Sequence, residues 1–238
     1  MMLKKMIMVV MVSGFLLQPA LAEMICPSTE YTPSYRSDQP IVDADELITI
    51  QGPLLPGGKI FCRVTNYVDY NVRSRIEEGT FNNVKYRFWY SNGSGAVQGL
   101  PTNTLDYEQD KYGTNWSLGC QKYQSDDAYW CSLYKPALRV VITKDGSYLV
   151  SVGKSHYPGS SITVRVDDNE PIMEPGETVF SKHQSAALVE QLKQGESVLT
   201  RYQEWPHRED KDELIDLFGF KEALAIMEKI HQVAGPKN

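Results

Sequence analysis

The chain has 238 residues, with 30 acidic and 24 basic side chains and a formal net charge of −6. This length is sufficient for one large domain or two small ones, each with a hydrophobic core. A negative chain repels nucleic-acid phosphates and anionic lipid surfaces unless it carries a local basic patch. No such patch is evident, because Arg73 and Arg75 are followed at once by Glu77 and Glu78. We therefore expect no nucleic-acid partner.

The first 22 residues are typical of a cleavable secretory signal peptide. Lys4 and Lys5 precede an apolar run from Met6 to Leu17, and the segment closes on Ala-Leu-Ala at residues 20–22. A positive start, a short apolar stretch and small residues at the end are the three parts of such a signal. We expect cleavage after Ala22, which removes two lysines and changes the formal net charge from −6 to −8.

Two other interpretations of this segment are less favoured. An uncleaved membrane anchor needs about 20 apolar residues, and this run is shorter. A lipoprotein needs small residues directly before its cysteine, but Glu23, Met24 and Ile25 precede Cys26. The sequence therefore predicts a periplasmic or secreted protein without a membrane anchor after cleavage.

Four cysteines remain after cleavage: Cys26, Cys62, Cys120 and Cys131. An even number in an exported chain favours disulfides over free thiols. Three connectivities are possible, and proximity favours Cys120 with Cys131, which leaves Cys26 with Cys62. Zinc is the alternative, but no Cys-x-x-Cys spacing or nearby histidine pair supports it. We expect no metal and no other cofactor.

Residues 23–113 are expected to form a β-rich N-terminal region. After an irregular leader, β-branched and aromatic runs bounded by Gly, Pro and Asn predict strands at Leu47–Ile50, Lys59–Tyr67 and Val84–Tyr90. The polar stretch from Pro101 to Asn115 predicts a long connection, with a domain boundary near residue 113.

For residues 114–234 the sequence predicts further strands and two helices. An Asp-Gly turn joins Leu138–Thr143 to Ser147–Gly153 as a hairpin. Ser181 and Gln184 predict a capping box for a helix that ends at Gly195. The remaining expected elements are strands at Ser161–Asp167, Val198–Trp205 and Glu213–Phe218, and an amphipathic helix after Gly219. The predicted class is mainly β with α (α+β), an antiparallel β-sandwich-like sheet with these two helices.

Several features follow one another in a recognisable order from Trp116 onward. They are the Asn-Trp-Ser-Leu-Gly-Cys stretch ending at Cys120, Cys131 after ten intervening residues, the hairpin, a strand ending in Val166-Asp167, the capped helix and the closing stretch 217–224. This order, over residues 116–231, resembles the invasion-associated locus B (IalB-like) family of bacterial periplasmic proteins. A similar layout occurs in some periplasmic accessory proteins of type VI secretion. The resemblance implies a β-sandwich-like domain with a C-terminal helix, and a virulence-associated setting.

No catalytic motif stands out, and three residues are the candidates for function. His156 lies in a loop that leads into a strand, where functional groups are often displayed. Trp89 and Trp130 belong to two aromatic clusters, and such side chains are enriched at binding interfaces. A surface histidine and core aromatics are the structural alternatives.

These observations favour a non-catalytic exported protein that acts through a binding surface. Its partner would be another protein or a component of the cell envelope, in envelope, host-interaction or secretion-system function. The alternatives are an enzyme acting on the cell wall or its glycans, and a toxin inhibitor or immunity protein.

The intact mass of the exported protein tests both the cleavage site and the disulfides. We expect the mass of the chain that begins at Glu23, lowered by the hydrogens lost in two disulfides and restored by reductant. The oxidising compartment maintains both bonds. Free thiols at all the cysteine positions, or a mass that includes the first 22 residues, would contradict this prediction.

Overall fold

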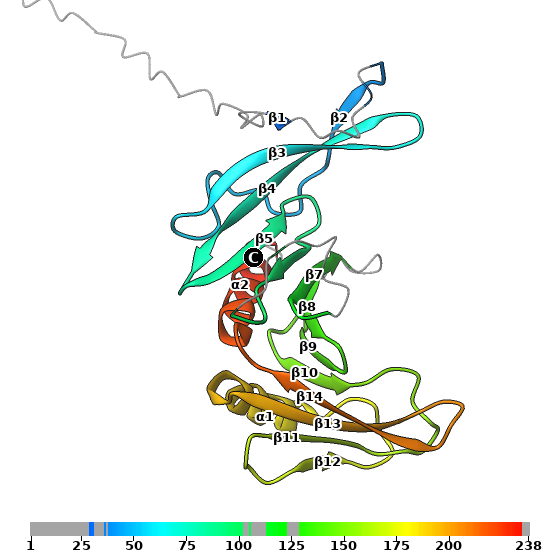
Figure 1. The fold of residues 1–238 in the computed structure, drawn as a ribbon. Helices are drawn as coiled ribbons and strands as arrows, with labels where there is room; N and C mark the ends of the chain where they lie inside the picture. Colours follow the sequence, from blue (N-terminus) through cyan, green and yellow to red (C-terminus); the bar gives the residue numbers. More distant parts are fainter. Residues whose placement is uncertain are drawn as a thin grey trace, which may run out of the picture.

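The structure is a computed structural model that describes residues 29–30, 36, 38–101, 105, 113–122 and 129–234 (Figure 1). The strands of these residues form two sheets, which two helices accompany. The predicted class, mainly β with two helices, is therefore confirmed. The finer sandwich-like packing and the boundary near residue 113 stay predictions. The expected signal peptide and Cys26 lie outside the described residues.

The larger sheet, sheet A, follows the order β1-β3-β4-β5-β6-β7-β8-β9-β10, with β2 paired to β4. Its strands from β3 to β10 are antiparallel, whereas β1 and β2 run parallel to their neighbours. The strands are β1 Thr29–Glu30, β2 Ile41–Asp43, β3 Lys59–Asn66, β4 Asn71–Phe81, β5 Val84–Trp89, β6 Gly95–Val97, β7 Trp116–Lys122, β8 Tyr129–Lys135, β9 Leu138–Ile142 and β10 Tyr148–Val152.

The smaller sheet, sheet B, follows the order β12-β11-β13-β14 and is antiparallel throughout. Figure 1 shows it in yellow-green and orange, at the end of the molecule away from β3 and β4. Its strands are β11 Ile162–Val166, β12 Ile172–Glu174, β13 Ser197–Glu204 and β14 Glu209–Asp216.

Helices α1 (Lys182–Gln194) and α2 (Phe220–Ala234) cover different strands. Helix α1 contacts β10, and α2 contacts β6, β7 and β8. The predicted capping box of α1 is confirmed, since the Ser181 side chain accepts from the Gln184 N–H. The start of α1 also covers the edge of β10, because Val150 N–H donates to Ser185 Oγ at 2.9 Å. Neither helix is long and apolar enough to cross a membrane.

Two strand predictions in the first half differ from the structure. Leu47–Ile50 is irregular rather than a strand, because its N–H groups at Leu47 and Ile48 bond to the Ser91 and Tyr90 carbonyls but no strand ladder continues from them. Strand β4 was not predicted, because its sequence, Asn-Val-Arg-Ser-Arg-Ile-Glu-Glu-Gly-Thr-Phe, carries four charged side chains. The hairpin of β9 and β10 is confirmed, and Gly146 has a φ of +77° in its turn.

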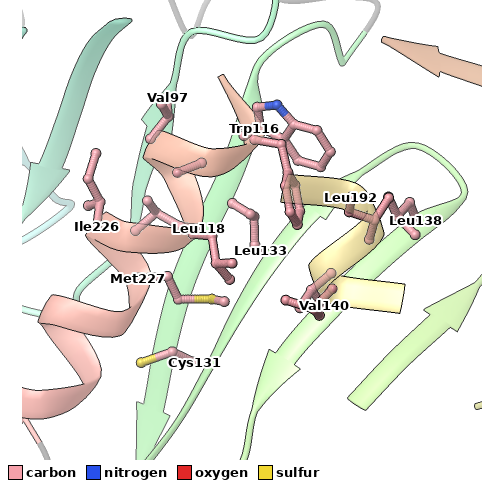
Figure 2. Packing of buried hydrophobic residues seen from close by; sticks show 14 of the residues in the cluster. Val97, Trp116, Leu118, Cys131, Leu133, Leu138, Val140, Leu192, Ile226 and Met227 are labelled. Atoms are coloured by element: carbon pink, nitrogen blue, oxygen red, sulfur yellow. The ribbon is translucent and has the colours of Figure 1, made fainter. Parts of the chain in front are cut away.

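A single hydrophobic core joins sheet A to both helices. Figure 2 shows Leu118, Leu133 and Met227 side by side between sheet A and α2. At one end of this core the Trp116 ring lies 5.1 Å from the Phe220 ring, and its indole N–H donates to the Phe218 carbonyl at 2.9 Å. The buried tryptophan thus fixes the start of α2 against β7.

The Cys120–Cys131 disulfide is present and joins directly opposed residues of β7 and β8. Both cysteines are buried. Cys62 is also disulfide-bonded, and its predicted partner, Cys26, falls outside the described residues.

Two buried charged side chains on β4 hold the irregular segment 44–58 against sheet A. The Arg75 guanidinium pairs with Glu46 at 2.7 Å, and donates to the carbonyls of Ile48 and Ile50 at 3.0 Å each. It also lies 3.7 Å from the centre of the Tyr90 ring. These bonds replace the strand partner that the segment lacks.

Glu77, which is fully buried, holds the next part of the segment. Its carboxylate accepts from the N–H groups of Leu54 and Leu55 at 2.7 and 3.2 Å, and from the hydroxyl groups of Tyr86 and Tyr90. Burial, and then the hydrogen bond to Glu77, raise the pKa of both tyrosines. Gly58 leaves the room that this arrangement needs, because a Cβ there would lie 2.1 Å from Glu77 Oε1.

We expect Glu77→Gln to lower the free energy of unfolding by about 3 kcal/mol, because an amide cannot accept all of these bonds and buries unpaired donors. Urea denaturation followed by circular dichroism measures this change. Glu78→Gln is the matched control. Glu78 is half-buried and pairs with Arg87, so its loss should cost less than about 1 kcal/mol. Equal losses for the two variants would contradict a structural role for Glu77.

Candidate functional site

Strand alternation divides the side chains of sheet A between two faces. In β7, Trp116, Leu118 and Cys120 are buried on the face that packs on α2. Ser117 and Gly119 point the other way, because successive side chains of a strand alternate. We call the face opposite α2 the outer face.

One cross-strand row of residues follows the outer face over most of sheet A. Directly paired residues share a face, so the register places the whole row on the same side. The row consists of Lys59, Glu78, Arg87, Ala96, Ser117, Tyr134 and Arg139.

Positive charge predominates on the outer face, at its β3–β5 end and separately at β9, four strands beyond β5. Among the described strands β3 to β10, its charged positions are Lys59, Arg63, Lys85, Arg87 and Arg139, with Glu78 as the single acid. Arg73 and Arg75 point to the other face, where they pair with Asp43 and Glu46. The expectation that the chain has no basic patch is therefore wrong. On β4 only Glu78 points outward, so the cations of the outer face come from β3, β5 and β9 rather than from this cluster.

One end of the outer face forms a cavity of about 470 Å³, which we call the basic cleft. Its lining residues are Gly57, Lys59, Glu78, Gly79, Thr80, Lys85, Tyr86, Arg87 and Leu105. Arg87 and Glu78 form an ion pair. Lys59 and Lys85 are exposed, and neither has an ion pair or side-chain hydrogen bond within the described part of the chain.

The wall of the basic cleft depends on the segment that Glu77 holds. Gly57 has a φ of +81°, and the turn closes through a bond from the Gly58 N–H to the Leu55 carbonyl at 3.1 Å. Leu55 itself is bonded to Glu77. Gly79, which also lines the cleft, leaves room for the buried Tyr86 on the inner face, since a Cβ there would lie 2.6 Å from the Tyr86 hydroxyl.

A second feature of the outer face is an aromatic patch, formed by Trp130, Tyr134 and Arg139. The Arg139 guanidinium lies 5.1 Å from the centre of the Trp130 ring, and Tyr134 is 46% exposed. Arg139 has no carboxylate partner among the residues that the structure describes. On β7, across from Ser132, Gly119 has nothing within 4 Å of the place where a Cβ would lie. The patch therefore has free space beside an unpaired cation.

Trp89 and Trp130, two of the predicted candidates, lie on the outer face. Trp89 is half-buried on β5 and is directly paired with Ile76 of β4. Trp130 is half-buried on β8. The aromatic runs in the sequence identified both residues, whereas the cations around them were missed because only the strand register brings them together.

His156, the third candidate, lies away from this face. Its loop follows β10 and pairs with the β13–β14 hairpin through a bridge to Glu204, and its ring is 5.6 Å from the Tyr202 ring. Burial lowers the pKa of His156, although a hydrogen bond to the Val152 carbonyl opposes this effect. No carboxylate is bonded to His156 among the described residues. These contacts fit a residue that packs a loop on sheet B.

The described residues contain no group of three or more His, Cys, Asp or Glu side chains that could hold a metal ion. No family model, curated protein or solved structure matches the chain. The geometry of the outer face is therefore the basis for a functional conclusion.

The pKa of His156 predicts a pH dependence of stability. A lowered pKa means that the unfolded chain binds the proton more readily, so stability falls as the pH drops below about 6.5 towards the folded pKa. His156→Gln should flatten this part of the profile, measured by urea denaturation between about pH 5 and 8. The exposed His183, changed to Gln, controls for the loss of a histidine. A profile that His156→Gln leaves unchanged would contradict the assignment.

Proposed function

We propose that the protein is a non-catalytic exported protein of the bacterial periplasm or exterior that acts through a binding surface, and that the outer face of sheet A is this surface. One observation carries the proposal. An acidic chain places Lys59, Arg63, Lys85 and Arg139 on one sheet face, and none of them has a carboxylate partner within the described residues.

The sign of this charge selects the partner. Unpaired cations on one face attract a negatively charged surface and raise its rate of encounter. Trp130 and Tyr134 add flat apolar area with polar tips beside Arg139, a combination that is common at binding interfaces. A negatively charged component of the cell envelope is therefore the proposed partner.

The proposal includes the resemblance to the IalB-like family and its sandwich-like packing. The residues that carry the resemblance, Trp116, Cys120 and Cys131, are buried in the core. They support the fold beneath the outer face and take no part in the surface itself. In this proposal, function depends on the residues of the same strands whose side chains point to the outer face.

Binding to envelope material tests the proposed surface. The mature protein is mixed with a washed bacterial envelope preparation, and the bound fraction is measured by sedimentation at about 0.05 M and about 0.5 M NaCl, since salt screens such contacts. The variant Lys59→Gln, Arg63→Gln, Lys85→Gln, Arg139→Gln should bind at least about tenfold more weakly, because each exposed cation near an anionic surface contributes about 1 kcal/mol.

A control variant removes the same amount of charge elsewhere. It combines Arg165→Gln, Arg208→Gln, Lys221→Gln and Lys229→Gln, all at exposed positions of sheet B, its β13–β14 turn and helix α2. This variant should keep the affinity of the parent within about twofold. Equal losses for the two variants would show that only net charge matters, and an unbound parent protein would reject the proposal outright.

A further inference from the structure

We infer that the basic cleft holds a sugar that carries a carboxylate or phosphate group, so that acidic carbohydrate is the ligand class of the outer face. The inference rests on the proposed function, because it names the chemistry of the same surface. It follows from the size of the cleft, its unpaired cations, and the acid between them.

The size of the cleft fits a small unit. Its volume of about 470 Å³ is in the lower part of the range for small-molecule sites, roughly 300–1,000 Å³. One or two sugar rings of a longer chain would enter such a cavity.

Lys59 and Lys85 enclose the cleft from two sides. Lys59 lies on β3 and Lys85 on β5, with β4 between them and an offset of two residues along it, so their backbones are about 12 Å apart. Both long side chains are exposed and unpaired within the described residues, and so both are available to one anionic group between them. Thr80, directly opposite Lys85, adds an exposed hydroxyl.

Glu78 makes the cleft unsuitable for a bare anion. It lies between Lys59 and Arg87 in the cross-strand row, and its carboxylate accepts only from Arg87 among the described side chains. A carboxylate has about four acceptor positions, so Glu78 keeps capacity for further donors. A ligand with hydroxyl groups beside its anionic group supplies those donors, whereas inorganic phosphate at neutral pH has fewer to offer.

The aromatic content of the cleft argues against a nucleotide. Tyr86 is 1% exposed, packs on Phe88 and donates its hydroxyl to Glu77. Its ring face is therefore not available for a base, although single-stranded nucleic acids are commonly held by stacking on aromatic rings. Glycines at positions 57 and 79 instead leave backbone close to the ligand.

Backbone amide NMR locates the ligand and identifies its chemistry. We would titrate the mature ¹⁵N-labelled protein with digalacturonate, glucose 1-phosphate, galactose and inorganic phosphate, at up to about 10 mM, since small ligands of this type bind in the millimolar range. Shifts at Gly57, Gly79 and Lys85 with either acidic sugar would support the inference, and the two sugars separate carboxylate from phosphate. Equal shifts with galactose, shifts confined to other regions, or no shifts would overturn it.

Two variants test the named side chains. Lys59→Gln with Lys85→Gln should weaken the acidic sugar at least about tenfold, and Lys154→Gln with Lys229→Gln should not. Glu78→Leu should weaken the acidic sugar but strengthen inorganic phosphate, because it removes the negative charge and both hydroxyl-accepting oxygens together. If Glu78→Leu strengthens both ligands, the cleft is a general anion site and the sugar assignment is wrong.

A negative result in this experiment can be distinguished from a negative result in the test of the proposed function. If the outer-face variant loses envelope binding but no acidic sugar shifts the cleft, only the ligand class is wrong. If envelope binding does not depend on the outer face, the proposed function is wrong, whatever the cleft binds.

Discussion

The buried charges of β4 are the interaction on which the rest of sheet A depends. Helix α2 reaches β6, β7 and β8, so the inner face of β3 to β5 needs another cover. The irregular segment 44–58 provides it with Ile48, Leu54 and Leu55, all buried. An irregular segment brings backbone polar groups into the core, and each one needs a partner. Arg75 and Glu77 supply those partners from the sheet itself.

The same strand produces the functional surface. Glu77 and Glu78 are neighbours in sequence, but alternation places one in the core and the other in the basic cleft. The acids and the arginines on the inner face take part in ion pairs and hydrogen bonds that hold the structure together. On the outer face few acids oppose the cations, and the segment held by Glu77 forms one wall of the cleft.

Much of the second half of the fold was predictable, because its signals are local. The capping box of Ser181, the Asp-Gly turn at 145–146 and the apolar stripe of α2 each depend on residues close in sequence. Strand β4 was not predictable, because its buried charged residues have the pattern of a surface segment. The irregular segment 47–50 was not predictable either, because its apolar run has the pattern of a strand. The cleft was beyond prediction for a related reason. Its cations come from β3 and β5 and meet only through cross-strand register.

Net charge is a poor guide to what this protein attracts, since its charges are segregated. Strand β14 carries Glu209, Asp210, Asp212, Glu213 and Asp216 at the end of sheet B. Charged side chains on such an edge prevent pairing with other strands, so this acidity has a role of its own. Electrostatic effects at the surface extend about 8 Å at physiological salt. A ligand at the basic cleft therefore meets the local cations of sheet A, and the acids of β14 add to the negative net charge without determining the binding.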